Sequence, residues 1–227
     1  MFVLNNTKEL KSRKTWIDNN GVQHPSNWAS VWSDDVKASY GIKEVSIQTK
    51  PDDKFYWVSG PHIDGTWTST ERNLEDVKEV DDDGKVILDA DGNQVITPGL
   101  KSQWITKTKE TANSLLAPTD WQVVAKAERD RAIDSDVATY RAAIITKCTA
   151  IRKAITDITY PETPSDYAAA RAKLEDDRTD AEKKIVSDHD AEVAAVFTSF
   201  KALFDTPVDS DGKPTGNPPM YDWPDSI

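Results

Sequence analysis

The stretch Ser135–Thr159, SDVATYRAAIITKCTAIRKAITDIT, decides the fold of this 227-residue chain. Its large apolar residues recur every three or four positions, which is the spacing of one face of an α-helix. At about 3.6 residues per turn this face continues for about six turns, and Ser135 or Asp136 can cap its start. The face consists of Val137, Tyr140, Ile144, Cys148, Ile151, Ile155 and Ile158. The stretch therefore predicts a long amphipathic helix that buries one side.

A second amphipathic stretch follows after Pro161 and Pro164, which break the chain. Ser165 can cap a helix that continues to Phe204, although residues 175–190 are dense in charge and poor in large apolar side chains. Its predicted apolar face consists of Tyr167, Ala170, Leu174, Ala181, Ile185, Val193, Val196, Phe197, Phe200, Leu203 and Phe204. Two such helices predict an antiparallel helical hairpin. The end with Phe197, Phe200 and Phe204 must be buried on the first helix or on another chain.

On the N-terminal side, a helix is expected from Leu100 to about Leu116, ended by Pro118. Its predicted stripe is Leu100, Trp104, Thr108, Thr111 and Leu115. The preceding residues 71–99 are acidic and rich in turns, and Asp91-Gly92 predicts two short strands joined there.

The first 70 residues indicate a small β-rich unit. Asn20-Gly21 is a signal for a two-residue hairpin turn between Thr15–Asp18 and Val22–His24. Ser33 can cap a short helix from Asp34 to Tyr40, with Gly41 as its C-terminal stop. The alternation at 45–49 and the apolar run 54–58 predict another hairpin. The dense tryptophans of this region favour a core over an exposed sugar-binding platform, because Trp buries a large area.

These patterns predict an α+β fold: an N-terminal β-rich unit followed by long amphipathic helices that form a helical hairpin. The expected segments are an aromatic-rich β unit (1–70), an acidic β-hairpin linker (71–99), a helical module (100–160), a long helix (165–204) and an extended Pro-rich tail (205–227). In the tail, Tyr221 and Trp223 are two aromatic anchors without a core of their own.

Charge and composition exclude several function classes. The net charge of −11 argues against binding nucleic acid through its phosphates and against docking on anionic lipid. No apolar run is long enough for a signal peptide or a membrane span. The single cysteine, Cys148, permits no disulfide within the chain and is read as an apolar residue of a helix face.

No pattern of catalytic residues is visible. The three histidines lie outside any metal-ligand spacing, and neither a P-loop, a dinucleotide fingerprint nor a nucleophile elbow occurs. Glu79-x-Asp81-x-Asp83-Gly84 is similar to the first half of an EF-hand loop, but its twelfth position is Ala90. We therefore expect no enzyme, no cofactor and no dedicated metal site. Two alternatives remain. One is a weak ion site in the acidic segment, and the other is a glycan hydrolase with carboxylates in a Trp-lined cleft.

Two stretches resemble tail-fibre assembly proteins of tailed bacteriophages. LLAPTDW at 115–121, followed by TYRAAI at 139–144, is similar to the C-terminal module of that family. A less specific likeness is a Trp-Gly-His-Pro-Asn-Trp pattern before a short helix and Gly-Ile, here Trp16, Gly21, His24, Pro25, Asn27, Trp28, Gly41 and Ile42. Together the two likenesses cover residues 14–145. The long second helix and the Pro-rich tail depart from the short members of the family.

This resemblance implies a non-enzymatic fibre chaperone or accessory protein that acts in the host cytoplasm and can be retained in the virion tail. Its partner would be a tail-fibre or baseplate protein, with homo-oligomerisation also open. The runner-up is a structural virion component that contacts the host receptor. Asp120 belongs to the family signature; the candidate partner-binding residues are Trp121, Tyr140, Arg141, Phe197, Phe200, Phe204, Tyr221 and Trp223. The alternative for the signature is local packing, with Trp121 under the helix start and Arg141 paired with an acid.

Overall fold

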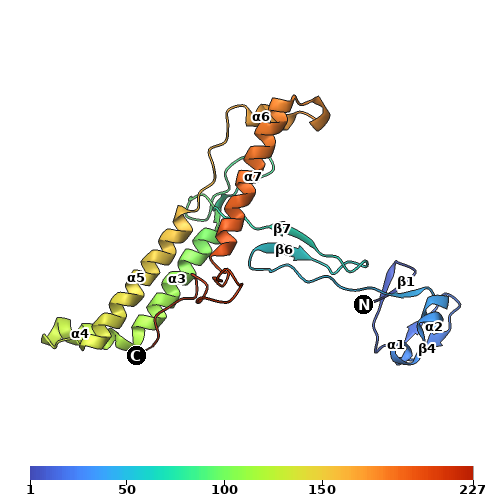
Figure 1. Cartoon of the computed structure of the whole chain (residues 1–227), viewed down its shortest axis with the longest axis horizontal. Coiled ribbons are helices and arrows are strands. Elements are labelled where there is room, and N and C mark those ends of the chain that lie inside the picture. Colours follow the sequence, from blue (N-terminus) through green and yellow to red (C-terminus); the bar gives the residue numbers. More distant parts are fainter. Residues whose placement is uncertain (227) are drawn as a thin grey trace. The chain divides into compact units, whose positions relative to one another are not determined.

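The computed structural model of the chain, which describes residues 1–226, has an α+β fold (Figure 1). It divides into two compact units, Met1–Arg72 and Asn73–Ile227. Short strands dominate the first unit, and long helices dominate the second. The predicted α+β class, with its β-rich unit ahead of long helices, is confirmed.

The first unit contains three small antiparallel sheets. One has three strands in the order β2-β1-β5, in which the central β1 pairs Leu4 with Lys8 on one side and with Ile42 on the other. The predicted hairpin at Trp16 is confirmed as β3 and β4. The elements are β1 (Phe2–Leu4), β2 (Lys8–Leu10), β3 (Trp16–Ile17), β4 (Gln23–His24), α1 (Trp28–Val31), α2 (Asp34–Ser39), β5 (Ile42–Glu44), β6 (Tyr56–Ser59) and β7 (Thr68–Glu71).

An aromatic cluster fills the core of this unit. Trp28 is fully buried against Leu4, Leu10, Trp16 and Ile42. Its indole Nε1 donates a hydrogen bond to the carbonyl of Lys14 at 3.2 Å, so its one polar group is satisfied. These tryptophans act as core residues, as their expected burial suggested, whereas Trp57 is 66% exposed.

The predicted strand at 45–49 is absent. In its place β6 pairs with β7, and residues 45–49 run beside the turn that joins those two strands. The Gln48 amide donates to the Gly65 carbonyl at 2.9 Å, and the Trp67 indole donates to the Gln48 carbonyl at 2.9 Å. A Cβ on Gly65 would lie 2.2 Å from the Ser46 carbonyl oxygen. The path of residues 45–49 therefore depends on Gly65, which is distant in sequence, so the alternation within 45–49 cannot predict it.

The β3–β4 turn is one of four turns with the sequence Asp-x-Asp/Asn-Gly and the same hydrogen bonds. They begin at Asp18, Asp81, Asp89 and Asp209. In each, one carboxylate oxygen accepts the amides two and four residues later, and the glycine has a positive φ. The loop therefore has three residues with a bulge at glycine, one more than the expected two-residue turn.

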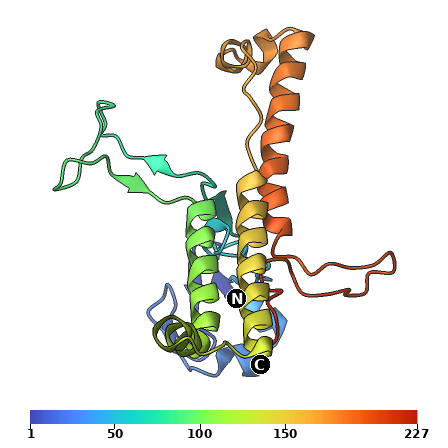
Figure 2. The same ribbon diagram turned by 90° about the vertical axis from the view of Figure 1, so that its left-hand side faces the viewer.

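In the second unit, α3 and α5 lie side by side and run antiparallel (Figures 1 and 2). The predicted face of α5 is confirmed, since Val137, Tyr140, Ile144, Ile151 and Ile155 are all buried. Leu100, Thr108 and Ala112 are the buried residues of α3. The elements are β8 (Val77–Lys78), β9 (Ile96–Thr97), α3 (Leu100–Leu116), the 3₁₀ turn η1 (Ala117–Thr119), α4 (Asp120–Arg129), α5 (Ser135–Asp157), α6 (Tyr167–Ala172), the 3₁₀ turn η2 (Glu175–Asp177) and α7 (Asp180–Ala202).

The predicted continuous helix over 165–204 is divided into α6, η2 and α7. Lys173 and Leu174 are extended, and so is Arg178. The Arg178 guanidinium donates to the carbonyls of Ala170, Arg171 and Lys173, so it satisfies the C-terminal carbonyls of α6. Among the helices, α7 packs mainly on α6, whereas α5 packs mainly on α3. The tightly packed helical hairpin is therefore α3–α5, and the expected pairing of 135–159 with 165–204 is wrong.

A capping box starts α7 and predicts a pH-dependent stability. The Glu182 carboxylate accepts hydrogen bonds from the Lys173 ammonium and from the Thr179 backbone amide, and these lower the pKa of Glu182 from 4.5 to about 2. Because this pKa is lower in the folded state, the contribution is complete above the ordinary glutamate value and is lost as the pH falls toward 2. Glu182→Gln should lower the melting temperature at pH 7 but have little effect at pH 2.

The measurement is the melting temperature of both proteins at pH 7, 4, 3 and 2. Glu192→Gln is the matched control, because Glu192 lies on an exposed face of the same helix. An equal effect of Glu182→Gln at every pH would contradict the role of its carboxylate.

Candidate partner-binding surfaces

The family-like residues form the corner where α3 passes through η1 into α4. Arg141 on α5 reaches across this corner and donates to the Leu116 carbonyl at 3.0 Å, the Thr119 hydroxyl at 2.7 Å and the Asp120 carboxylate at 2.8 Å. The buried Tyr140 places its hydroxyl 3.5 Å from the Leu115 carbonyl. Arg141 thus holds the end of α3 and the start of α4 on α5.

These contacts are internal to the unit. The predicted pairing of Arg141 with an acid is confirmed, and Tyr140 is buried within its own unit. Trp121 differs from the expectation that it packs under the helix start, because it is 53% exposed with the Arg131 guanidinium 5.3 Å from its ring centre. It shares the outer side of α4 with the exposed Val124.

The three phenylalanines of α7 are buried inside their own unit. Phe197, Phe200 and Phe204 are 3%, 0% and 9% exposed, and the Phe204 ring lies 4.6 Å from the Trp104 ring. Phe204 is therefore covered by α3 and by the chain's own tail, and the Phe200 ring packs on Phe204 at 5.5 Å. Periodicity indicated that this face is buried, but it could not say against which element.

The C-terminal tail covers the end of α7 near Leu203 and Phe204. The Met220 amide donates to the Leu203 carbonyl at 3.1 Å, and the Tyr221 ring lies 6.1 Å from that of Phe204. Trp223 packs against the cluster of Ala112, Tyr140 and Ile144, and Lys147 binds Asp222 at 2.7 Å. Tyr221 and Trp223 thus anchor the tail on the helices of the same chain.

An arm formed by residues 77–97 leaves the helices of this unit (Figure 2). It contains β8 and β9 and a middle segment that forms isolated bridges beside them, Val86 with Val80 and Leu88 with Gln94. Its exposed apolar side chains are Val80, Val86, Ile87, Leu88 and Ile96. The sequence predicts the turns of this arm but not the exposure of its apolar side chains, because such short apolar runs usually pack on a core.

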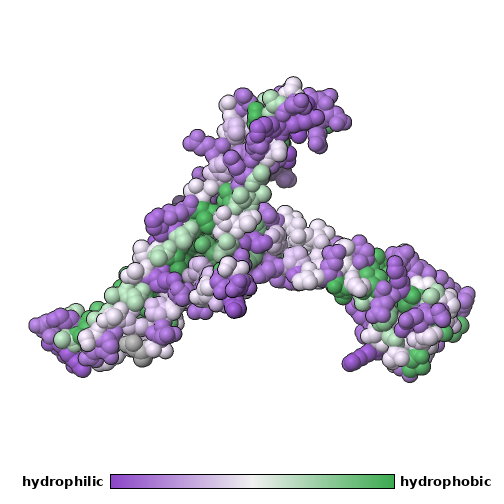
Figure 3. Space-filling model, in the orientation of Figure 1, coloured by the Kyte–Doolittle hydropathy of each residue, from purple (hydrophilic) through white to green (hydrophobic). Residues whose placement is uncertain are grey.

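Polar residues cover much of the remaining surface. Figure 3 shows hydrophobic residues along the helix pair, at the α4 end and on the first unit, between hydrophilic regions. Within residues 1–226, no group of three or more histidine, cysteine, aspartate or glutamate side chains is placed to hold a metal ion. None of the described helices has the length and apolar content needed to cross a bilayer. Comparison with protein-family models, curated proteins and solved structures gave no match.

Proposed function

We propose that this chain is a non-enzymatic accessory protein of a phage tail fibre that binds the fibre through the 77–97 arm and assists its assembly. The observation that carries the proposal is the set of exposed apolar side chains on this arm, between 39% and 57% exposed. Exposed apolar groups on a strand-rich segment are typical of protein-binding sites. The family-like residues at 115–121 and 139–144 support the choice of partner.

The arm offers a second feature that suits a β-rich partner. β8 and β9 form a two-stranded sheet, and the middle segment of the arm bridges only to residues beyond them, Val80 and Gln94. Within the part of the chain that the structure describes, the outer edges of β8 and β9 themselves therefore have no strand partner. A fibre that is still folding also has unpaired strand edges and exposed apolar surface, which make it prone to aggregate. Strand addition between the two would satisfy both edges. The phenylalanines of the helical face expected for this task are buried within their own unit, so the proposal assigns the contact to the arm instead.

Co-expression with the adjacent fibre gene tests this function. We expect soluble trimeric fibre with the wild-type chain and at least about tenfold less with Val86→Lys and Leu88→Lys, because each lysine puts a charge into the buried contact. Leu174→Lys is the control, since Leu174 is 76% exposed and lies outside the arm. Equal yields from the wild type and from the three variants, or no copurification with fibre, would reject the proposal.

The alternative function is a structural virion component, a fibre or baseplate protein that contacts the host receptor. The anchoring of Met220, Tyr221 and Trp223 on the helices favours a long-lived assembly part. Purified particles decide between the two. Two results together would support the alternative: the fibre folds without this protein, and mature particles contain this protein at a fixed stoichiometry.

A further inference from the structure

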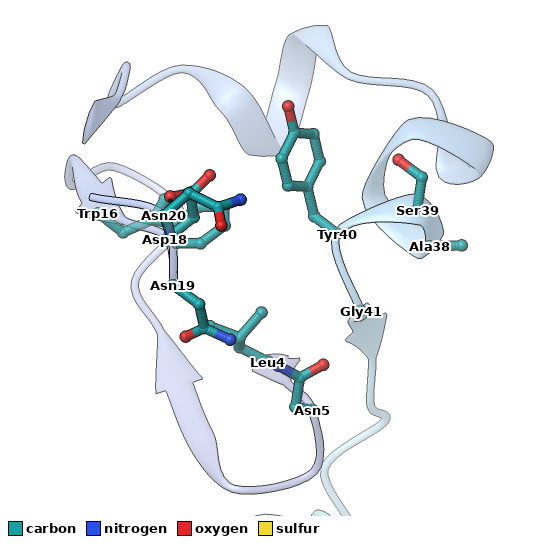
Figure 4. Close-up of a pocket in the computed structure, with 10 residues that line it drawn as sticks. All are labelled: Leu4, Asn5, Trp16, Asp18, Asn19, Asn20, Ala38, Ser39, Tyr40 and Gly41. Atoms are coloured by element: carbon teal, nitrogen blue, oxygen red, sulfur yellow. Dashed lines mark hydrogen bonds between the residues drawn. The ribbon is translucent and has the colours of Figure 1, made fainter. Parts of the chain in front are cut away.

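A pocket of about 420 Å³ lies in the N-terminal unit (Figure 4). Three segments that are distant in sequence surround it: the turn after β1, the β3–β4 turn, and the end of α2. Its volume is within the usual range for small-molecule sites, which is about 300–1,000 Å³. The lining residues are Leu4, Asn5, Trp16, Asp18, Asn19, Asn20, Ala38, Ser39, Tyr40 and Gly41.

Local backbone geometry fixes the walls of this pocket. Asn5 has a φ of 51°, and its amide donates to the Gly41 carbonyl at 2.8 Å. A Cβ on Gly41, whose φ is 72°, would lie 2.1 Å from the Asn5 side-chain oxygen, so only glycine allows this approach. On the opposite wall, Asp18 holds its turn through the amides of Asn20 and Val22 at 2.8 and 2.9 Å. The walls are therefore set before any ligand enters.

Several polar groups of the lining are available to a ligand. The side-chain amides of Asn5, Asn19 and Asn20 have no hydrogen-bond partner among residues 1–226. The indole Nε1 of Trp16 likewise has no acceptor there, although Trp16 is only 6% exposed. A buried indole N–H is normally bonded. Because this nitrogen is itself buried, the groups open to a ligand are the three side-chain amides.

The charge of the lining selects the class of ligand. No lysine, arginine or histidine lines the pocket, so an anion would find no cationic partner in it. Its one carboxylate is already occupied, because the Asp18 oxygens accept two backbone amides and lie 3.1 Å from the His24 ring nitrogen. Those amides, Val22 first, lower the pKa of Asp18, so this group stays ionised and repels anions. Amide groups donate and accept at once, which matches ligand hydroxyls.

We infer that this pocket binds a neutral saccharide, with the amides of Asn5, Asn19 and Asn20 on its hydroxyls and the Tyr40 ring against one face of the sugar. Tyr40 is 40% exposed and stacks on Trp32 at 5.0 Å, so its ring offers a supported flat apolar surface beside the amides. This inference is independent of the fibre proposal, because the pocket belongs to the first unit and the arm to the second.

Binding is measured on the full chain alone. The probes are the methyl glycosides of glucose, galactose, mannose and N-acetylglucosamine, followed by saturation-transfer NMR and tryptophan fluorescence. At least one should bind with a Kd of about 1 mM or below, a value common for a site with few contacts. Sorbitol and inorganic phosphate are comparison ligands. No saturable binding of any glycoside, or equal binding of sorbitol or phosphate, would overturn the inference.

The four related turns supply the decisive variant. Asn19→Ala together with Asn20→Asp gives the first turn the sequence Asp-Ala-Asp-Gly, which the chain already uses at Asp89–Gly92 with the same hydrogen bonds. The fold should therefore be kept. Glycoside affinity should fall about tenfold, since two amides that contact hydroxyls are lost.

The reciprocal exchange is the matched control. Ala90→Asn with Asp91→Asn introduces the first turn's residues into the arm, outside the N-terminal unit. Glycoside binding should be unchanged. If the first exchange leaves the affinity unaltered while the melting temperature is kept, the amides do not contact the ligand and the inference fails.

Discussion

Trp28→Ala is expected to unfold the N-terminal unit while the helical unit stays folded. Large-to-small changes at a buried tryptophan cost about 3–5 kcal/mol. Trp28 is fully buried, and its ring lies 5.1 Å from Phe2 and 6.2 Å from Trp32. A unit of this length is stable by only about 4–11 kcal/mol, at roughly 0.05–0.15 kcal/mol per residue. The loss of one side chain is thus about a quarter or more of the stability of the unit, and equals all of it at the lower end of that range.

Near-ultraviolet circular dichroism and urea unfolding measure this effect, because the aromatic cluster gives the N-terminal unit its own signal. Trp57→Ala is the matched control, since Trp57 belongs to the same unit but is 66% exposed, with the Arg72 guanidinium 4.7 Å from its ring centre. An exposed cation–π contact contributes about 0.5–1 kcal/mol, so the control should shift the midpoint slightly. Equal midpoints for the two variants would contradict the assigned core.

Ile144→Asp should disrupt the α3–α5 pair. Ile144 is fully buried in the cluster with Ala112 and Tyr140, and Trp223 of the tail packs on the same cluster. An aspartate there loses the apolar contacts and buries a carboxylate without a cationic partner, which together cost more than about 4 kcal/mol. We expect loss of cooperative helix melting and release of the tail, followed by far-ultraviolet circular dichroism and limited proteolysis after residue 204.

The neighbouring residue gives the control. Ile145 is on the same helix but is 55% exposed, so Ile145→Asp should change the stability by no more than about 0.5 kcal/mol. If the variants at 144 and 145 melt at the same temperature, the face of α5 that packs on α3 has been wrongly assigned.

The elements with a local cause could be predicted from sequence. The α5 face follows from its spacing, and α2 follows from Ser33, whose hydroxyl accepts the Val36 amide as expected. The break between α6 and α7 has no local signal in the apolar pattern. It is stabilised by Arg178, whose guanidinium donates to the C-terminal carbonyls of α6. The apolar pattern predicts that a face is buried but not which element covers it.

The candidate binding residues show the same limit. Phe197, Phe200 and Phe204 have the spacing of a docking face, yet all three are buried within their own unit, where α3 and the tail pack on Phe204. The N-terminal pocket had no sequence signal at all, because Asn5, Asn20 and Tyr40 meet only after β1 has paired with β5 and the β3–β4 hairpin has formed.

The recurrent Asp-x-Asp/Asn-Gly turn has a consequence for folding kinetics. Each turn joins residues only four positions apart, so its closure costs little entropy, and hairpins of this kind form in about 1–10 µs. Such turns occur in both units and again in the tail at Asp209. The slow steps are then the distant pairings, Phe2 with Glu44 in the first unit and Trp223 with the α3–α5 cluster in the second. Residues 220–223 are therefore needed to complete the helical unit, so a chain emerging from the ribosome cannot finish this unit until that segment has been made.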